Sequence, residues 1–109
     1  MWQPLKEEAQ LNKIKEASFK KPQLIFKHSI SCGISAHINH SLQTAEQDLG
    51  KQIDLHYLDL INYRSVSNLV ASEFNVRHQS PQVLLIKDGE VTFHTSHFSI
   101  NPEKILAAV

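Results

Sequence analysis

The sequence predicts an α/β fold: one four-stranded mixed β-sheet with helices on both faces. Apolar runs of strand length alternate along the chain with segments whose apolar residues recur at helical spacing. Strands that are separated by a helix are joined in parallel through right-handed crossovers. The pair Asp88–Gly89 follows the third apolar run and favours a two-residue hairpin, which adds an antiparallel strand. The predicted order is helix, strand, helix, strand, helix, strand, hairpin strand, helix.

Short apolar runs define the four strands, which we expect over residues 23–28, 52–60, 83–86 and 91–95. The third run, Val83–Ile86, consists of four consecutive branched apolar residues. Such a run is typical of a central strand that is buried on both faces of its sheet.

Apolar residues at helical spacing predict four helices, over residues 4–20, 33–49, 64–74 and 102–108. The second helix has the clearest stripe: Ile34, Ile38, Leu42, Ala45 and Leu49. We expect Gly50 to end this helix, because glycine favours the position after a helix C-terminus. Asn62 or Ser65 is expected to cap the third helix, and Asn101 is expected to cap the last.

Length, composition and charge narrow the class of protein. The 109 residues, 41% of them hydrophobic, suit a single domain over residues 1–109. Eleven basic and eleven acidic residues cancel, so we expect no nucleic-acid partner and no membrane partner. No apolar run approaches the roughly 18–20 residues of a membrane span. A single cysteine and the lack of signal-peptide features at the start predict a cytoplasmic protein.

The one cysteine, Cys32, lies between the end of a predicted strand and the start of a predicted helix. A helix N-terminus stabilises a thiolate, and such positions lower a cysteine pKa from ~8.5 to ~3.5–7.5. Ser35 can direct its hydroxyl toward the sulfur, and Gly33 leaves the sulfur open to a substrate. The C-x-x-S motif therefore predicts thiol–disulfide exchange, with Cys32 as nucleophile and Ser35 as its hydrogen-bond donor.

A second signal is Pro81, which directly precedes the buried strand over residues 83–86. The predicted order of elements is that of the thioredoxin fold, with a helix before the first strand. Proteins of this fold keep a cis-proline beside the active cysteine. We therefore predict a cis Ser80–Pro81 bond, which turns the Ser80 backbone toward an incoming peptide or small thiol.

Several segments of the chain carry a family resemblance. The stretch around Cys32 reads HSISCGIS, and the others are Tyr57–Ile61, Tyr63–Arg64, Val76–Val83, Lys87–Gly89 and His94–His97. Together they resemble the YtxJ-type monothiol bacilliredoxins, a redox family of the bacillithiol system, over Trp2–Leu106. In one departure, Gly33 stands where this family often has proline, which makes the motif similar to the C-G-F-S of monothiol glutaredoxins.

The resemblance implies a cytoplasmic protein that removes bacillithiol from S-bacillithiolated proteins. Cys32 attacks the mixed disulfide and carries bacillithiol, a co-substrate, until a second small thiol, another redoxin or a reductase releases it. No bound cofactor and no metal are implied. We expect substrate to lie against Gly33, Ser80 and Pro81, and Arg77 and His78 to meet carboxylates of the small thiol. Lys27 and His28 end the first predicted strand beside Cys32, where either side chain could stabilise the thiolate or point away from it.

Two other functions stay open at this point. The motif also suits a monothiol-glutaredoxin-like carrier of an iron–sulfur cluster, although the Gly-Gly pair and acidic residue with which that family binds glutathione are missing after Val91. A redox-inert binding domain on the same scaffold is the other alternative. The seven histidines do not predict a metal site, since His37 and His40 lie off the apolar stripe of their helix and are expected to face solvent.

Overall fold

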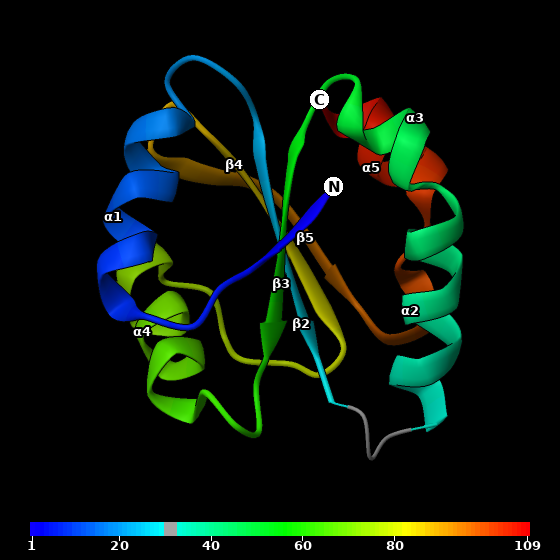
Figure 1. Cartoon of the computed structure of the whole chain (residues 1–109), viewed down its shortest axis with the longest axis horizontal. Coiled ribbons are helices and arrows are strands. Elements are labelled where there is room, and N and C mark those ends of the chain that lie inside the picture. Colours follow the sequence, from blue (N-terminus) through cyan, green and yellow to red (C-terminus); the bar gives the residue numbers. More distant parts are fainter. Residues whose placement is uncertain (30–32) are drawn as a thin grey trace.

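A mixed sheet with helices on both faces forms the protein in a computed structural model, which describes residues 1–29 and 33–109 (Figure 1). The strands are β1 (Trp2–Pro4), β2 (Gln23–His28), β3 (Asp54–Asp59), β4 (Gln82–Lys87) and β5 (Glu90–Ser96). The helices are α1 (Glu8–Ala17), α2 (Gly33–Thr44), α3 (Glu46–Gly50), α4 (Arg64–Phe74) and α5 (Pro102–Ala108), and a 3-10 turn, η1, spans His97–Ser99. Within the described ranges, no helix is both long and apolar enough to cross a membrane.

The sheet has five strands in the order β1-β3-β2-β4-β5, so the prediction of four strands was wrong. β1, β3 and β2 are parallel to one another, whereas β4 and β5 run antiparallel to their neighbours. The strand that was missed, β1, has three residues, too few to show a period, and Pro4 favoured a helix start instead. Pro4 is tolerated because β1 is an edge strand that pairs only with β3 among the described strands.

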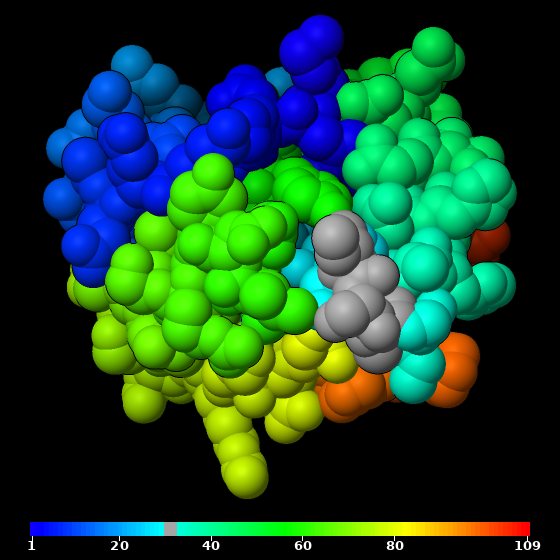
Figure 2. Space-filling view, turned by 60° about the horizontal axis from the view of Figure 1, so that its bottom comes forward, coloured from blue at the N-terminus to red at the C-terminus, as the bar shows by residue number. Residues whose placement is uncertain are grey.

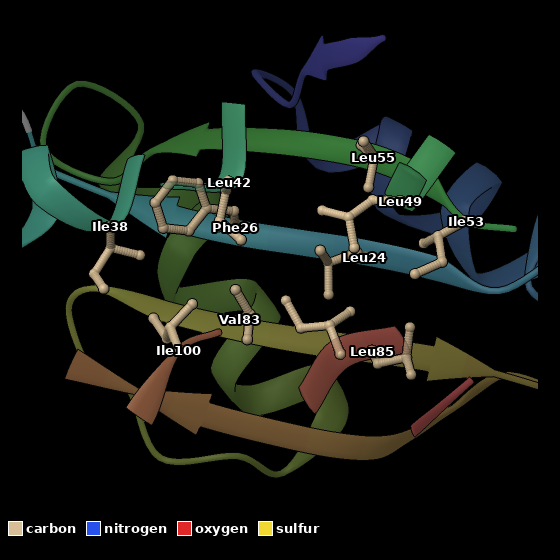
Figure 3. Close-up of a cluster of buried hydrophobic side chains, with 11 residues drawn as sticks. Leu24, Phe26, Ile38, Leu42, Leu49, Ile53, Leu55, Val83, Leu85 and Ile100 are labelled. Atoms are coloured by element: carbon tan, nitrogen blue, oxygen red, sulfur yellow. The ribbon is translucent and has the colours of Figure 1, made fainter. Parts of the chain in front are cut away.

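Two hydrophobic cores fill the two faces of the sheet. One lies under α2, α3 and α5, and Figure 3 shows Ile38 and Leu42 of α2 meeting Phe26 of β2 and Val83 of β4. The other lies under α1 and α4 and includes Ile25 of β2. Alternation along β2 therefore sends Phe26 to one core and Ile25 to the other. Full burial of an apolar side chain of this size contributes about 1.5–3 kcal/mol to folding.

Two details of the helices differ from the predictions. The helix expected over residues 33–49 is two helices, α2 and α3, which break at Ala45, and Gly50 is the last residue of α3 rather than a stop behind it. Neither Asn62 nor Ser65 caps α4, whose N-cap is Tyr63. Asn62 instead donates its side-chain N–H to Asp59 at 2.7 Å, which satisfies the amide before the helix begins.

Other local predictions are confirmed. Asp88 and Gly89 both have positive φ angles, 54° and 81°, as a two-residue hairpin turn of this type requires. The Asn101 side chain accepts hydrogen bonds from the backbone N–H groups of Glu103 and Lys104 and so caps α5. These features are confirmed because they depend on a few neighbouring residues.

Candidate active site

Cys32 lies outside the described residues, so the site is built from the segments on either side of it in the sequence. β2 ends at His28, and α2 begins at Gly33, directly after Cys32 in the chain. The predicted position of the cysteine in the sequence, after a strand and before a helix, therefore agrees with the bounds of these two elements. The acidity of its thiol stays a prediction.

Ser35 connects the start of α2 to the end of β2. Its side chain is fully buried, and its Oγ accepts a hydrogen bond from the backbone N–H of Ser29 at 3.4 Å. Gly33 is exposed, and a Cβ built on it would meet no atom within 4 Å. A side chain at position 33 would thus fit the described surroundings, so packing does not explain the glycine.

The Ser80–Pro81 peptide bond is cis, as predicted. Pro81 is buried at the entry to β4, and its carbonyl accepts a hydrogen bond from the backbone N–H of His97 at 3.0 Å. β2 and β4 are antiparallel and pair Lys27 with Gln82, so His28 and Pro81 are the next residues at the same end of the sheet. Figure 2 shows this end of the molecule, where the start of α2, the stretch before β4 and the stretch after β5 share one surface.

Arg77 is exposed in the segment between α4 and β4. Its backbone carbonyl accepts a hydrogen bond from Gln82 Nε2 at 2.9 Å, which holds this segment to the beginning of β4. Its side chain takes part in none of the ion pairs among the described residues. The structure therefore brings Arg77, Ser80 and Pro81 to the same end of the sheet, while their role in binding substrate stays a prediction.

His28 is buried on the α2 face of the sheet, 2% exposed, although it stands at the end of a strand. Its ring lies 5.5 Å from that of Phe26 and 5.3 Å from that of Tyr57, centroid to centroid. Burial lowers its pKa, which the charge of Asp59 and a backbone hydrogen bond at Ser35 only partly offset. Among the described residues, its Nδ1 has no hydrogen-bond partner. Burial at this end of β2 therefore favours the neutral form of the His28 imidazole.

Lys27 points to the opposite face of the sheet and is fully buried beneath α4. Its Nζ donates to the backbone carbonyl of Ser67 at 3.0 Å and lies 3.2 Å from His78 Nδ1. Burial lowers the Lys27 pKa from 10.5 to about 8. His78 is half-buried, and its pKa is lowered by burial and then by the positive charges of Lys27 and Arg64.

The sequence reasoning named Lys27 and His28 only as neighbours of Cys32 that could face either way, and it missed Ser67. A signal for the two-sided arrangement was present, since consecutive residues of a strand face opposite sides of its sheet. No signal in the sequence pointed to Ser67, whose backbone carbonyl reaches Lys27 only through the packing of α4 on the sheet. The prediction that His37 and His40 face solvent is confirmed, because both are exposed.

A mixed sheet in this strand order, with a cysteine before α2 and a cis-proline before β4, defines a thioredoxin-fold protein of the single-thiol kind. Solved structures agree with the fold. A protein provisionally described as an oxidoreductase with a thioredoxin fold is similar with a TM-score of 0.83 and 28% identity, over 98% of this chain and 92% of that one. The thioredoxin of Malassezia sympodialis has a TM-score of 0.75 and 17% identity, over 99% and 87% of the two chains. The thioredoxin of Fasciola hepatica has a TM-score of 0.74 and 17% identity, over 96% and 93%.

The family is more specific than the fold. The family model for the monothiol bacilliredoxin BrxC matches residues 3–105, and the chain belongs to this family. Its one cysteine agrees with the monothiol description. The protein is therefore a monothiol redox protein on a thioredoxin-like scaffold.

Proposed function

We propose that this protein removes bacillithiol from S-bacillithiolated proteins by thiol–disulfide exchange at Cys32, in the manner implied by its resemblance to the YtxJ-type bacilliredoxins. The observation that carries the proposal is the match to a monothiol bacilliredoxin family in a chain whose one cysteine is Cys32. A reducing compartment such as the cytoplasm suits this chemistry, because the thiol must be free to react.

The reaction has two exchange steps. In the first, the Cys32 thiolate attacks the bacillithiol sulfur of a mixed disulfide, a new S–S bond joins Cys32 to bacillithiol, and the substrate protein leaves as a thiolate that takes up a proton. In the second, the thiolate of a further small thiol, a redoxin or a reductase attacks the bacillithiol sulfur on Cys32. This step returns the Cys32 thiolate and leaves bacillithiol in a disulfide with the attacking thiol.

Ser35 explains why an external thiol is needed. It stands three residues after Cys32, where a dithiol redox protein would have a second cysteine, and its hydroxyl cannot displace a thiolate from sulfur at neutral pH. The mixed disulfide on Cys32 should therefore persist as a one-to-one adduct, and its decay should scale with the concentration of added thiol.

Intact mass spectrometry tests this proposal with a model protein that carries a bacillithiol mixed disulfide. The unmodified protein should take up one bacillithiol, and Cys32→Ser should abolish the transfer. Ser35→Cys should release the adduct without added thiol, whereas a control cysteine on the exposed face of α4, Ser72→Cys, should not. If Cys32→Ser still removes bacillithiol at the original rate, the exchange proposal is wrong and a redox-inert scaffold replaces it.

The choice of small thiol needs its own comparison. The same protein is exposed in parallel to oxidised bacillithiol, oxidised glutathione and oxidised cysteine, and the mass of the adduct is recorded. Selective uptake of bacillithiol is the expected result. Equal uptake of all three would contradict the assignment to bacillithiol while leaving the exchange chemistry intact.

A further inference from the structure

The strand β5 forms one edge of the sheet, where β4 alone pairs with it among the described strands (Figure 3). It has seven residues, Glu90–Ser96, whereas β1, at the other edge, has three residues and ends at Pro4. An edge strand leaves a row of backbone N–H and C=O groups free to pair with another strand. Proline cannot donate to such a pairing, so the edge at β1 is short and blocked, while the edge at β5 is long.

The hydrogen bonds between β4 and β5 show which backbone groups of β5 face outward. His97 donates its N–H to the Pro81 carbonyl at 3.0 Å, and bonded residues alternate along an antiparallel pair. Thr95 therefore also bonds to β4, whereas His94 and Ser96 direct their N–H and C=O groups away from it. No other described backbone group bonds to His94 or Ser96. These two residues thus present two free donors and two free acceptors at the outer edge of the sheet.

The second half of β5 lacks the features that keep natural edge strands from pairing, which are lysine, proline and bulges. β5 contains no lysine and no proline, and its one acidic residue, Glu90, stands at its beginning. The register between β4 and β5 is irregular at Leu85 and Ile86, toward the hairpin. The section Phe93–His97 is therefore regular, free of carboxylates and ammonium groups, and open along its outer edge.

We propose that β5 binds β5 of a second copy of this chain, so that two molecules form one continuous sheet about a twofold axis at Thr95. In this antiparallel register, His94 of each copy lies opposite Ser96 of the other. Each such pair exchanges two backbone hydrogen bonds, and the twofold axis makes four in all, which uses every outward group of these two residues. The two Thr95 side chains face each other, and threonine pairs of this kind stabilise neighbouring strands.

The charges of the chain suit a second copy as the occupant of this edge. Eleven basic and eleven acidic residues cancel, so two copies do not repel each other at long range near neutral pH. Like charges directly opposite each other destabilise a strand pair, and the register about Thr95 brings none together within Phe93–His97. The contact is therefore electrostatically neutral at both long and short range.

The architecture also limits the assembly to two copies. The joined sheet has β1 at both of its outer edges, and a strand of three residues that ends at Pro4 is a poor template for further pairing. Pairing over five residues of each strand is a small contact beside the ~1,200–2,000 Å² buried in stable complexes. We therefore expect a weak dimer, with a dissociation constant on the order of 0.1 mM.

Sedimentation velocity tests this inference, which goes beyond the proposed exchange function and does not depend on it. The protein is measured from about 10 μM to about 1 mM with a reductant present, so that no disulfide joins two copies through Cys32. The sedimentation coefficient should rise with concentration from the monomer value toward the dimer value. A coefficient that stays at the monomer value up to about 1 mM would overturn the proposal.

His94→Pro locates the contact. The His94 N–H points away from β4, so proline at this position removes no hydrogen bond within the chain, and edge strands tolerate it. The dimer uses this N–H twice, once from each copy, so its dissociation constant should increase about tenfold or more. A dimer that forms equally well in the folded variant would overturn the assignment to β5.

A charge swap at the twofold axis gives a second, independent readout. Thr95→Lys and Thr95→Glu each place two like charges opposite each other, which should weaken self-association about fivefold. An equal mixture of the two variants should restore it, because Lys then faces Glu. Thr44→Lys and Thr44→Glu, at an exposed position on α2, change the net charge equally and should have no such effect. If the mixture associates no better than either Thr95 variant alone, the proposed register is wrong.

Discussion

The two ends of β2 bury polar side chains on the same face of the sheet, under α1 at one end and under α4 at the other. At the beginning of β2, Gln23 accepts a hydrogen bond from His56 Nε2 at 2.7 Å and donates one to Asp54 at 2.8 Å. Lys21 pairs with the same carboxylate at 3.1 Å. At the end of β2, Lys27 lies beside His78, and neither takes part in an ion pair among the described residues.

The pKa values follow this difference in pairing. Burial raises the Asp54 pKa, but the hydrogen bonds from Gln23 and Lys21 outweigh that effect, so the pKa is lowered and the carboxylate stays charged. Burial lowers the Lys27 pKa with no charge to compensate it. At the beginning of β2, the polar side chains hydrogen-bond and pair with one another. They therefore need no ligand, even though a cavity of about 210 Å³ borders them. Lys27 instead has hydrogen bonds to a neutral carbonyl and an imidazole, which do not offset the burial of its charge.

Substitution of Lys27 should have the largest effect on the free energy of unfolding. Between pH 8 and 10.5, the folded protein has released the Lys27 proton while the unfolded chain still holds it, so the free energy of unfolding rises with pH. The full shift in pKa corresponds to about 3 kcal/mol. Lys27→Met should abolish this rise and increase the free energy of unfolding near neutral pH by about 1–3 kcal/mol, since an apolar chain replaces a buried charge.

Urea unfolding at about pH 7.5 and about pH 10 measures this effect, with Lys104→Met as the exposed control. A Lys27→Met protein that is less stable than the original near neutral pH would show that the two hydrogen bonds of Lys27 outweigh the cost of burying its charge.

Substitution in the hydrogen-bonded group at the beginning of β2 should change the free energy of unfolding in the opposite direction. Gln23→Leu removes the partner of the His56 N–H and one donor to Asp54, and it should lower the free energy of unfolding by about 1–3 kcal/mol. Exchange activity should stay unchanged, because Gln23 lies at the other end of the strand from Cys32. The control is Gln52→Leu, at an exposed position. Equal stability of the two variants would mean that the paired network contributes nothing to folding.

A smaller effect is expected at the exchange site. Ser35→Ala should raise the pKa of the Cys32 thiol by about one unit, because the hydroxyl that we predict to stabilise the thiolate is lost. Thiolate absorbance as a function of pH measures this shift, and Ser41→Ala on the same helix is the control. A midpoint in the original protein at or above the free-cysteine value of ~8.5 would show that burial outweighs the helix N-terminus.

The smallest expected effect is on the free energy of unfolding at acidic pH, and it involves His56. The His56 pKa is lowered from 6.5, mainly by burial, so below pH 6.5 the unfolded chain binds a proton that the folded protein does not. The free energy of unfolding should therefore fall as the pH decreases through this range. His56→Gln should make the decrease less steep, whereas the exposed His40→Gln should not. Unfolding at about pH 7 and about pH 5.5 compares the two variants; identical slopes would contradict the lowered pKa of His56.

The sequence by itself determined the features that depend on neighbouring residues. Asp88–Gly89 set the hairpin because a two-residue turn needs positive φ angles that these residues tolerate. The periods of the apolar residues located four of the five strands and the helix over residues 64–74. The C-x-x-S motif indicated single-thiol chemistry, since one cysteine cannot form an internal disulfide. Pro81 was predicted to stand at the entry to a strand because a buried apolar run follows it directly.

Only the tertiary structure decided which polar groups meet. β1 is a strand because its backbone pairs with the edge of β3. Its three residues are too few to show a pattern that would predict this pairing. Lys27 and His28 are adjacent in the sequence, yet the alternation of β2 sends one beneath α4 and the other beneath α2. Ser67 and His78 come to Lys27 from segments far along the chain, because α4 packs across β2. Contacts of this kind depend on the packing of a helix on the sheet, which local sequence does not encode.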